Sequence, residues 1–203
     1  MSITTYTLIA DGTSDRVLLP VINWVLDQID GISYVPQYAE HTLRPSAGLL
    51  RRVESAAKIY ECDVLFVHRD AEGLTFQRRI DEIQHELAAL GRHYVPVVPV
   101  RMTEAWLLID EAAIRAAAHN PKGKTPLNLP GIDRLESVVD PKELLFDKLR
   151  LASELSARRT QKFRPETCRH RVAELISDFS PLQKISSFRR FESDVKMAFD
   201  HLA

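Results

Sequence analysis

Cysteine is scarce in this sequence, with only Cys62 and Cys168 among 203 residues. Two cysteines are too few for a disulfide framework or for a structural zinc site with four cysteine ligands. No apolar run is long enough to cross a membrane, and no charged-then-apolar leader follows Met1. We therefore expect a cytoplasmic protein that is neither inserted into a membrane nor secreted.

Several catalytic motifs are missing as well. Gly123-Lys124-Thr125 looks like the end of a phosphate-binding loop, but that loop needs a glycine five residues earlier, where Ala118 stands. His68-Arg69-Asp70 lacks the paired cysteines that complete a zinc deaminase site. No Ser-His-Asp or Cys-His spacing is recognisable either. These absences exclude the corresponding enzyme classes.

The overall composition is that of a globular protein, with 45% hydrophobic and 27% charged residues. Such a chain can bury the core of one domain of about 120 residues together with a smaller additional segment. Residues 120–131 are rich in helix and strand breakers and should form a loop. We expect an α/β domain at residues 1–119 and a helical, basic extension at residues 120–203.

The net charge of −1 hides an asymmetry between these two parts. Residues 1–120 hold 11 basic and 16 acidic side chains, whereas residues 121–203 hold 16 and 12. One segment of the extension is especially basic, with Glu166 as its only carboxylate: Arg158, Arg159, Lys162, Arg164, Arg169 and Arg171. This density could neutralise several phosphates of a nucleic acid. The alternative is a solvated linker and helix face.

Four short segments have the composition of buried strands, being apolar and rich in β-branched or aromatic residues. They are residues 3–10, 33–38, 63–67 and 94–101. Apolar stripes at helical spacing predict helices between and after them, at residues 14–30, 48–61, 74–90, 141–156, 165–177 and 181–202. Short, nearly continuous apolar strands are typical of sheets that helices cover on both faces. The alternation of strands and helices therefore predicts a doubly wound parallel α/β sheet.

The order of the strands follows from two prolines. Pro96 and Pro99 remove two backbone donors from the fourth strand, which is tolerated mainly at the edge of a sheet. With right-handed crossovers, the simplest arrangement is then 2-1-3-4, in which strands 1 and 3 are adjacent and point the same way. The helical C-terminal appendage follows this sheet.

Carboxylates follow both central strands. Asp11-Gly12 closes the first strand, and Asp70-Ala71-Glu72-Gly73 closes the third. Open parallel sheets bind ligands at the carboxyl ends of their strands, where the strand order reverses, so these acids should be neighbours. If the chain is still extended at residues 70–72, the two acids there project to one side. Such oxygen ligands suit Mg²⁺ or Mn²⁺, which can polarise a phosphodiester and activate water.

Each acidic residue near this edge also has a structural alternative. Asp11 could be the N-cap of the following helix, and Asp15 is expected to face solvent in its first turn. Glu104 opens a helical stretch at residues 103–108, so it could bind a further metal or simply favour a helix N-terminus. His68 is expected to be packed or hydrogen-bonded rather than a metal ligand.

These residues resemble the Toprim domain of topoisomerases, primases and overcoming-lysogenisation-defect nucleases. That family has an acid-Gly pair after strand 1 and an acid-x-acid motif after strand 3, which correspond to Asp11-Gly12 and Asp70-x-Glu72. Residues 101–108 also resemble a block in small Toprim-like bacterial proteins, some of which accompany ATPases in defence against mobile elements. The resemblance covers about residues 1–118. The family usually has Glu at the first position and Asp at the last, whereas this chain has Asp11 and Glu72.

The resemblance implies a Mg²⁺-dependent nuclease that acts on DNA or RNA, with an ATPase as a potential partner. Asp11 would be the general acid/base or a metal ligand, Asp70 and Glu72 would bind the metal, and Glu104 would be a ligand of a second metal. Basic residues would hold the substrate backbone: Arg44, Arg69, Arg101, Arg158, Arg159, Lys162 and Arg164.

Two other functions fit parts of the same pattern. A degenerate Toprim module could serve as a binding subunit of a larger complex, with the helical appendage as its docking surface. A phosphoacceptor receiver domain also gathers carboxylates after strands 1 and 3 of a doubly wound sheet. That class needs a fifth strand ending in Lys, and the sequence offers only helix and loop after Ile114.

Overall fold

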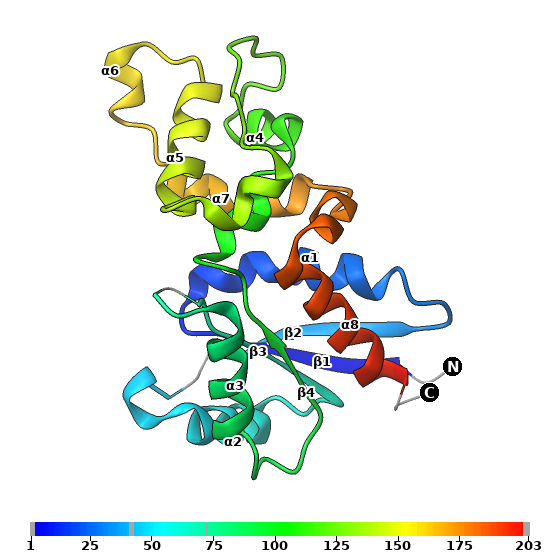
Figure 1. The fold of residues 1–203 in the computed structure, drawn as a ribbon. Helices are drawn as coiled ribbons and strands as arrows, with labels where there is room; N and C mark the ends of the chain where they lie inside the picture. Colours follow the sequence, from blue (N-terminus) through cyan, green and yellow to red (C-terminus); the bar gives the residue numbers. More distant parts are fainter. Residues whose placement is uncertain (1–2, 41–42, 72, 201–203) are drawn as a thin grey trace.

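The computed structural model describes residues 3–40, 43–71 and 73–200 (Figure 1). Its single sheet has four parallel strands in the order β2-β1-β3-β4, as the sequence predicts. The strands are β1 (Ile3–Ile9), β2 (Ser33–Tyr38), β3 (Val64–His68) and β4 (Tyr94–Val97). The fold class and the strand order are therefore confirmed, and the carboxyl ends of β1 and β3 lie side by side.

Helices cover both faces of this sheet (Figure 1). One face packs against α1 (Leu18–Leu26) and α8 (Ser186–Asp200), and the other against α2 (Leu49–Ile59) and α3 (Phe76–Glu86). Successive strand side chains point to opposite faces, so Leu8 joins the first of these cores and Ile9 the second. All five residues of β3 are buried because both of its faces are covered.

The remaining helices form a lobe beyond the sheet, at the top of Figure 1. We call it the helical lobe, and it contains α4 (Glu111–Ala117), α5 (Pro141–Ala152), α6 (Ala157–Thr160) and α7 (Pro165–Leu175). One hydrophobic core runs from Leu8 of the sheet through Leu145 of the lobe to Phe188 of α8. Apolar packing thus crosses the boundary expected near residue 119. None of the helices within the described ranges is both long and apolar enough to cross a lipid bilayer.

Several elements are shorter than the sequence patterns predict, and prolines explain two cases. The helix expected at residues 14–30 divides into a 3₁₀ helix, η1 (Thr13–Val17), and α1, because Pro20 lacks an N–H and fits only the first turn of an α-helix. β4 ends at Val97, before Pro99 and before Arg101, whose φ of 70° is not extended. The last expected helix divides into η5 (Ser180–Lys184) and α8.

Further 3₁₀ helices lie in the connections between these elements. They are η2 (Pro45–Ala47), η3 (Thr103–Leu107) and η4 (Ile132–Ser137). The second of them, η3, follows β4 and is buried throughout. Residues 120–131 contain no helix or strand, as expected for a loop. Because η3 directly follows the sheet edge, it brings Thr103 and Glu104 near the carboxyl ends of the strands.

Candidate functional site

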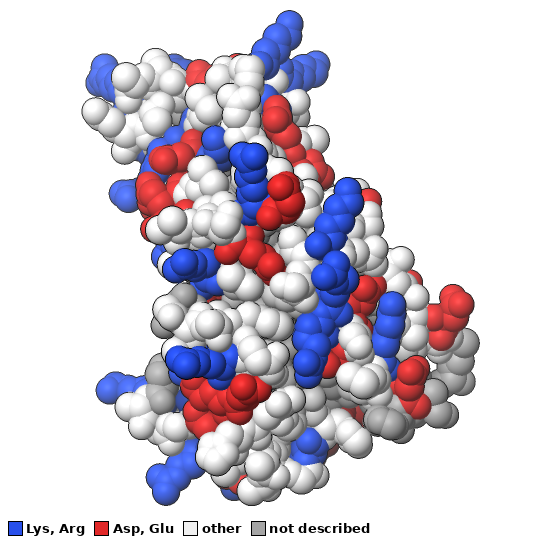
Figure 2. Space-filling model, viewed as in Figure 1, with Lys and Arg blue, Asp and Glu red and all other residues white. Residues whose placement is uncertain are grey.

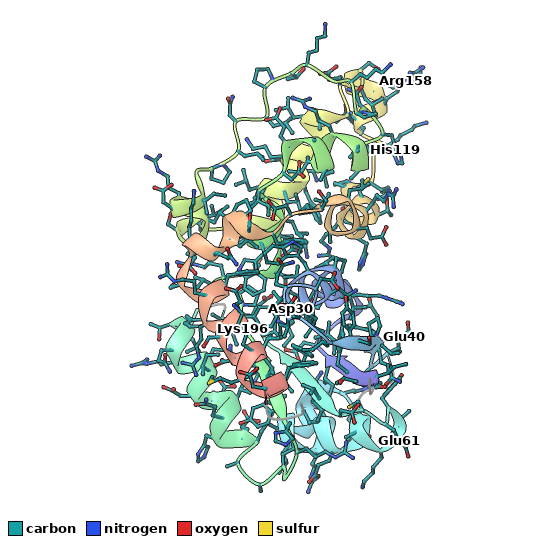
Figure 3. The ribbon with its side chains drawn as sticks, turned by 90° about the vertical axis from the view of Figure 1, so that its right-hand side faces the viewer. Asp30, Glu40, Glu61, His119, Arg158 and Lys196 are labelled. Atoms are coloured by element: carbon teal, nitrogen blue, oxygen red, sulfur yellow. The ribbon has the colours of Figure 1, made fainter. Side chains whose placement is uncertain are left out.

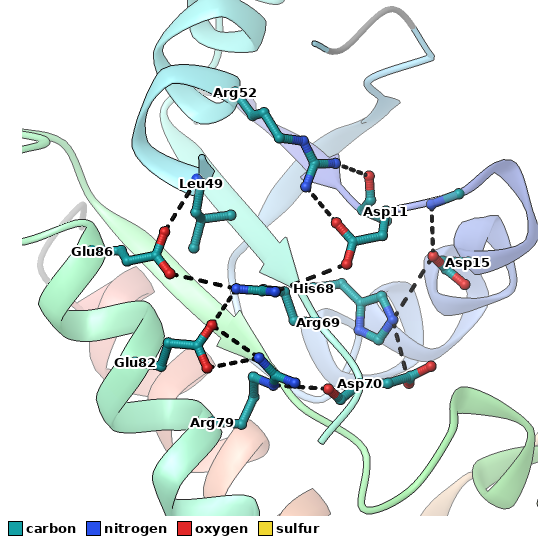
Figure 4. Close-up of polar contacts among 12 residues, drawn as sticks. Asp11, Asp15, Leu49, Arg52, His68, Arg69, Asp70, Arg79, Glu82 and Glu86 are labelled. Atoms are coloured by element: carbon teal, nitrogen blue, oxygen red, sulfur yellow. Dashed lines mark hydrogen bonds and ion pairs between the residues drawn. The ribbon is translucent and has the colours of Figure 1, made fainter. Parts of the chain in front are cut away.

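A small cavity of about 90 Å³ lies at the carboxyl ends of β1 and β3, and both carboxylate and guanidinium groups line it. We call it the strand-end cavity, and its lining residues are Asp11, Asp15, His68, Arg69, Asp70 and Arg79. Figure 4 shows these side chains converging from the two strand ends, η1 and α3. The predicted neighbourhood of Asp11 and Asp70 is thus present. Glu72, the third predicted acid, lies outside the described residues.

Asp11 is held by a buried arginine. The side chain of Arg52, on α2, is 4% exposed and forms an ion pair with the Asp11 carboxylate, whose own side chain is 42% exposed (Figure 4). The same guanidinium donates to the carbonyl oxygens of Ala10, at 2.9 Å, and Leu43, at 3.1 Å. Gly12 rather than Asp11 is the N-cap residue of η1, so the carboxylate of Asp11 does not serve as that cap.

Asp15 does not face solvent, so the sequence-based expectation for this residue is wrong. The tight turn of η1 folds the chain back, and the Gly12 N–H donates to Asp15 Oδ2 at 3.1 Å. This places Asp15 Oδ2 3.9 Å from His68 Nε2, with the Asp15 side chain only 15% exposed. Asp15 is the third residue after the N-cap Gly12, and at this spacing an acidic side chain can accept a hydrogen bond from the N-cap N–H, which is a local signal in the sequence.

His68 and Asp70 form the opposite wall of the cavity. His68 is 2% exposed, and its Nδ1 donates to the Val97 carbonyl oxygen at 2.8 Å. This bond aims Nε2 at Asp70 Oδ1, 3.5 Å away. The Thr103 hydroxyl also donates to Asp70 Oδ1, at 3.4 Å. His68 is therefore packed and hydrogen-bonded, as expected from the sequence.

The electrostatics of the cavity centre on Asp70. Burial raises the pKa of Asp70 to about 6, and the negative charges of Asp15 and Glu104 also raise it, while His68 and Thr103 lower it. Within residues 3–40, 43–71 and 73–200, neither Asp15 nor Asp70 forms an ion pair with Lys or Arg. A cation placed between these carboxylates would relieve their mutual repulsion.

Arginines link Asp11 and the Asp70 main chain to α3. Arg69 forms an ion pair with Glu82, and its guanidinium is also 3.5 Å from Glu86 Oε1 and 3.9 Å from Asp11 Oδ2. Arg79 donates through Nη1 to Glu82 Oε2 at 2.7 Å. These contacts form one continuous network at the edge of the strand-end cavity (Figure 4).

Glu104 lies close enough to influence Asp70 but already has a cationic partner. It is 5% exposed in the first turn of η3, and Arg169 of α7 forms a buried ion pair with it. Its charge still raises the pKa of Asp70. The ion pair with Arg169 connects the helical lobe to the sheet edge, a contact that the sequence did not predict.

The carboxylates of the strand-end cavity supply oxygen donors of the kind that hard divalent cations prefer, and Arg69 and Arg79 lie beside them. The oxygen atoms of Asp11, Asp15 and Asp70 are the ligands that Mg²⁺ and Mn²⁺ prefer in proteins. No group of three or more His, Cys, Asp or Glu side chains is drawn together in metal-binding geometry within the part of the chain that the structure describes. Glu72 is outside that part. Binding of a metal would therefore require these carboxylates to close around it.

The basic residues expected to bind nucleic acid divide into two groups. Arg69 lines the strand-end cavity, and Arg44 and Arg101 are exposed in loops that precede η2 and η3. The others lie in the helical lobe and are all exposed: Arg158, Arg159, Lys162 and Arg164. Figure 3 shows Arg158 at the upper end of the molecule, and Figure 2 shows several basic side chains projecting there.

A larger groove of about 540 Å³ lies between η1, α1 and α7. Thr13 and Arg16 line one side, and His170 and Glu174 line the other. Burial lowers the pKa of His170, and the nearby charges of Arg169 and Arg16 lower it further. The groove is next to the strand-end cavity because Asp15 lies between Thr13 and Arg16 on the same short helix.

Comparisons of the chain with protein-family models, curated proteins and solved structures gave no match. The resemblance to Toprim domains therefore depends on Asp11-Gly12, Asp70-x-Glu72 and residues 101–108, together with the observed strand order.

Proposed function

We propose that this protein is a Mg²⁺- or Mn²⁺-dependent nuclease of the Toprim type that hydrolyses nucleic-acid phosphodiesters. The observation that carries the proposal is the convergence of Asp11, Asp15 and Asp70 on one small cavity at the ends of adjacent parallel strands. The raised pKa of Asp70 supports it further: burial is its main cause and the charges of Asp15 and Glu104 add to it, so a bound cation would stabilise the charged form of this carboxylate.

In this proposal Asp15 and Asp70, with Glu72, hold the metal, and Glu104 is a ligand for a second ion that would displace Arg169. The bound metal would supply polarisation of a phosphoryl oxygen and activation of water. Asp11, fixed by Arg52, would be either a further ligand or the general acid/base, which must approach its proton to within about 3 Å. Arg69 would contact the phosphate from the cavity wall.

The same proposal assigns the substrate path. A nucleic-acid strand would enter the groove between η1 and α7, where Arg16 and His170 lie next to the strand-end cavity. The exposed cations of the helical lobe would neutralise more distant phosphates. Cytoplasmic residence belongs to this proposal and is supported by two free cysteines, Cys62 and Cys168. Defence against mobile elements with an ATPase partner is its wider context, supported by the sequence resemblance.

A binding module without catalysis is the second candidate function, and two ion pairs favour it. Arg52 already neutralises Asp11, and Arg169 already neutralises Glu104, as internal counterions would in a protein that needs no metal. A receiver domain has less support, because β4 is followed by η3 and α4, and no fifth strand occurs within the described ranges.

The experiment that tests the proposal is a cleavage assay with supercoiled DNA, single-stranded DNA and RNA, each in Mg²⁺, Mn²⁺ or EDTA. We expect metal-dependent cleavage that Asp70→Ala abolishes. Asp81→Ala is the matched control, since Asp81 is an exposed carboxylate on α3 that contacts Gln77 rather than the cavity. Intact substrate in every lane, together with no Mn²⁺ binding by calorimetry, would favour the binding module.

A further inference from the structure

We propose that Glu82 is a positioning residue that holds the guanidinium of Arg69 away from close contact with Asp11 Oδ2, the oxygen that does not pair with Arg52, so that this oxygen stays available to a metal ion. The inference depends on the proposed function, in which the strand-end cavity binds Mg²⁺ or Mn²⁺, and it takes Asp11 as the further ligand of that metal. It assigns a role to a residue on α3 that does not itself line the cavity.

Arg69 stands between two sets of carboxylates. On the α3 side, Glu82 forms its closest ion pair, and Glu86 Oε1 is 3.5 Å from its Nη1 atom. On the cavity side, Asp11 Oδ2 is 3.9 Å from its Nε atom. Figure 4 shows the Arg69 guanidinium between these groups, with contacts to Glu82 and Glu86 of α3 on one side and to Asp11 on the other. The carboxylates on α3 therefore compete with Asp11 for the same cation.

Glu86 alone is a weaker competitor than Glu82. Its other oxygen, Oε2, accepts the backbone N–H of Leu49 at 3.1 Å, so the carboxylate is shared with the start of α2. Glu82 is also oriented toward the cavity edge by Arg79, whose Nη1 donates to both Glu82 oxygens at 2.9 and 2.7 Å. Arg79 is in turn fixed by donating through Nε to the Asp70 carbonyl oxygen at 2.9 Å.

Loss of the negative charge at Glu82 should move Arg69 toward Asp11. Arg69 is permanently protonated, so when Glu82 becomes neutral its guanidinium would pair more closely with the remaining carboxylates, Glu86 and Asp11. Arg52 already pairs with Asp11 Oδ1, so a close contact of Arg69 with Oδ2 would add a second positive charge and occupy the oxygen that remains for a divalent cation. Glu82 thereby sets the metal affinity of the cavity without touching the metal.

Mn²⁺ binding to the purified full chain, measured by calorimetry and by electron paramagnetic resonance of free Mn²⁺, tests this role. We expect Glu82→Gln to weaken Mn²⁺ binding about tenfold, the lower end of the range for residues that orient metal ligands. The matched control, Asp81→Asn, removes the same charge from the adjacent position of α3 and should change the affinity less than twofold. Because Glu82 is partly exposed, its substitution leaves the hydrophobic core intact.

The decisive comparison repeats Glu82→Gln in an Arg69→Met background. If Arg69 is the competitor, removing it abolishes most of the Glu82→Gln effect, leaving a loss below threefold. An equal, roughly tenfold loss in both backgrounds would show a general structural effect and overturn the inference. Wild-type Mn²⁺ binding that Glu82→Gln leaves unchanged would overturn the inference alone, whereas no wild-type binding would overturn it together with the proposed function.

Discussion

Arg52 shows how a single buried side chain can fix a candidate catalytic acid. Its guanidinium has three acceptors on two separate stretches of chain: the Ala10 carbonyl and the Asp11 carboxylate after β1, and the Leu43 carbonyl before α2. Arginine suits this position because its planar fork presents several donors in fixed directions. Lysine has one compact ammonium group and could not satisfy all three acceptors. The residue is therefore both a structural tie and the counterion of Asp11.

Replacement of Arg52 by Met should lower the free energy of unfolding by about 2 kcal/mol, because buried acceptors lose their donor. The exposure of Asp11 limits the loss, since water can solvate that carboxylate. Urea denaturation measures the change. Arg51→Met is the control, because Arg51 is exposed on the same helix and should change stability by less than about 0.5 kcal/mol. Equal losses of unfolding free energy in both variants would contradict the conclusion that Arg52 joins the two stretches of chain.

At the scale of elements, α8 is the helix that joins the C-terminal part of the chain to the sheet. Aromatic rings make the connection: the centroid of Phe188 is 5.3 Å from that of Trp106 in η3, and Phe191 is 6.3 Å from Phe66 in β3. Edge-to-face pairs of this kind add to the free energy of apolar burial. The helix therefore acts as a covering layer of the sheet rather than as a detached appendage.

Truncation of Phe188 to Ala should lower the free energy of unfolding by about 3 to 5 kcal/mol, the range for removing a buried aromatic side chain. Phe188 is fully buried, whereas Met197 on the same helix is 52% exposed. Met197→Ala should accordingly change stability by less than about 0.5 kcal/mol. Chemical denaturation followed by tryptophan fluorescence compares the two variants. A loss below about 1 kcal/mol for Phe188→Ala would mean that α8 contributes little to the fold.

At the scale of the whole molecule, charge is distributed unevenly. The basic residues at 158–164 are exposed on the helical lobe, and the strand-end cavity lies at the carboxyl ends of β1 and β3. Figure 1 shows the lobe above the sheet, and Figure 3 shows Arg158 at the upper end of the molecule. The ion pair between Arg169 of α7 and Glu104 of η3 connects the helical lobe to the edge of the sheet. In the proposed function, the lobe would hold a polyanion while a metal compensates its charge at the cavity.

Neutralising Arg158 and Arg159 together, as R158Q/R159Q, should weaken binding of labelled single-stranded DNA. It should also lower the slope of log affinity against log salt by about 0.7 for each phosphate that is no longer neutralised. Fluorescence anisotropy at several salt concentrations measures both quantities. The control is K58Q/R92Q, because Lys58 lies in the last turn of α2 and Arg92 precedes β4, so both exposed residues lie at the edge of the sheet opposite the strand-end cavity. The same change in both double variants would indicate only a net-charge effect.

Much of the sheet could be predicted from the sequence because the composition of each short segment indicates whether that segment forms a strand. Apolar runs marked the strands, and prolines in the fourth strand placed it at the edge. Parallel strands end at a common edge, so Asp11 and Asp70 were correctly expected to be neighbours. Element ends were less predictable, since Pro20 divides one expected helix and the turn at Arg101 shortens the last strand.

Sequence patterns alone specified which segments are strands and helices, the order of the strands and the position of two acids at their ends. The ion pairs of Asp11 and Glu104 with distant arginines emerged only when the helices packed on the sheet. Arg52 and Asp11 are separated by 41 residues, and Arg169 and Glu104 by 65. The periodicity of apolar residues specifies which face of a single helix or strand is buried. A salt bridge between distant residues depends on which helices pack together and how deeply each side chain is buried. The packing of the whole core determines both.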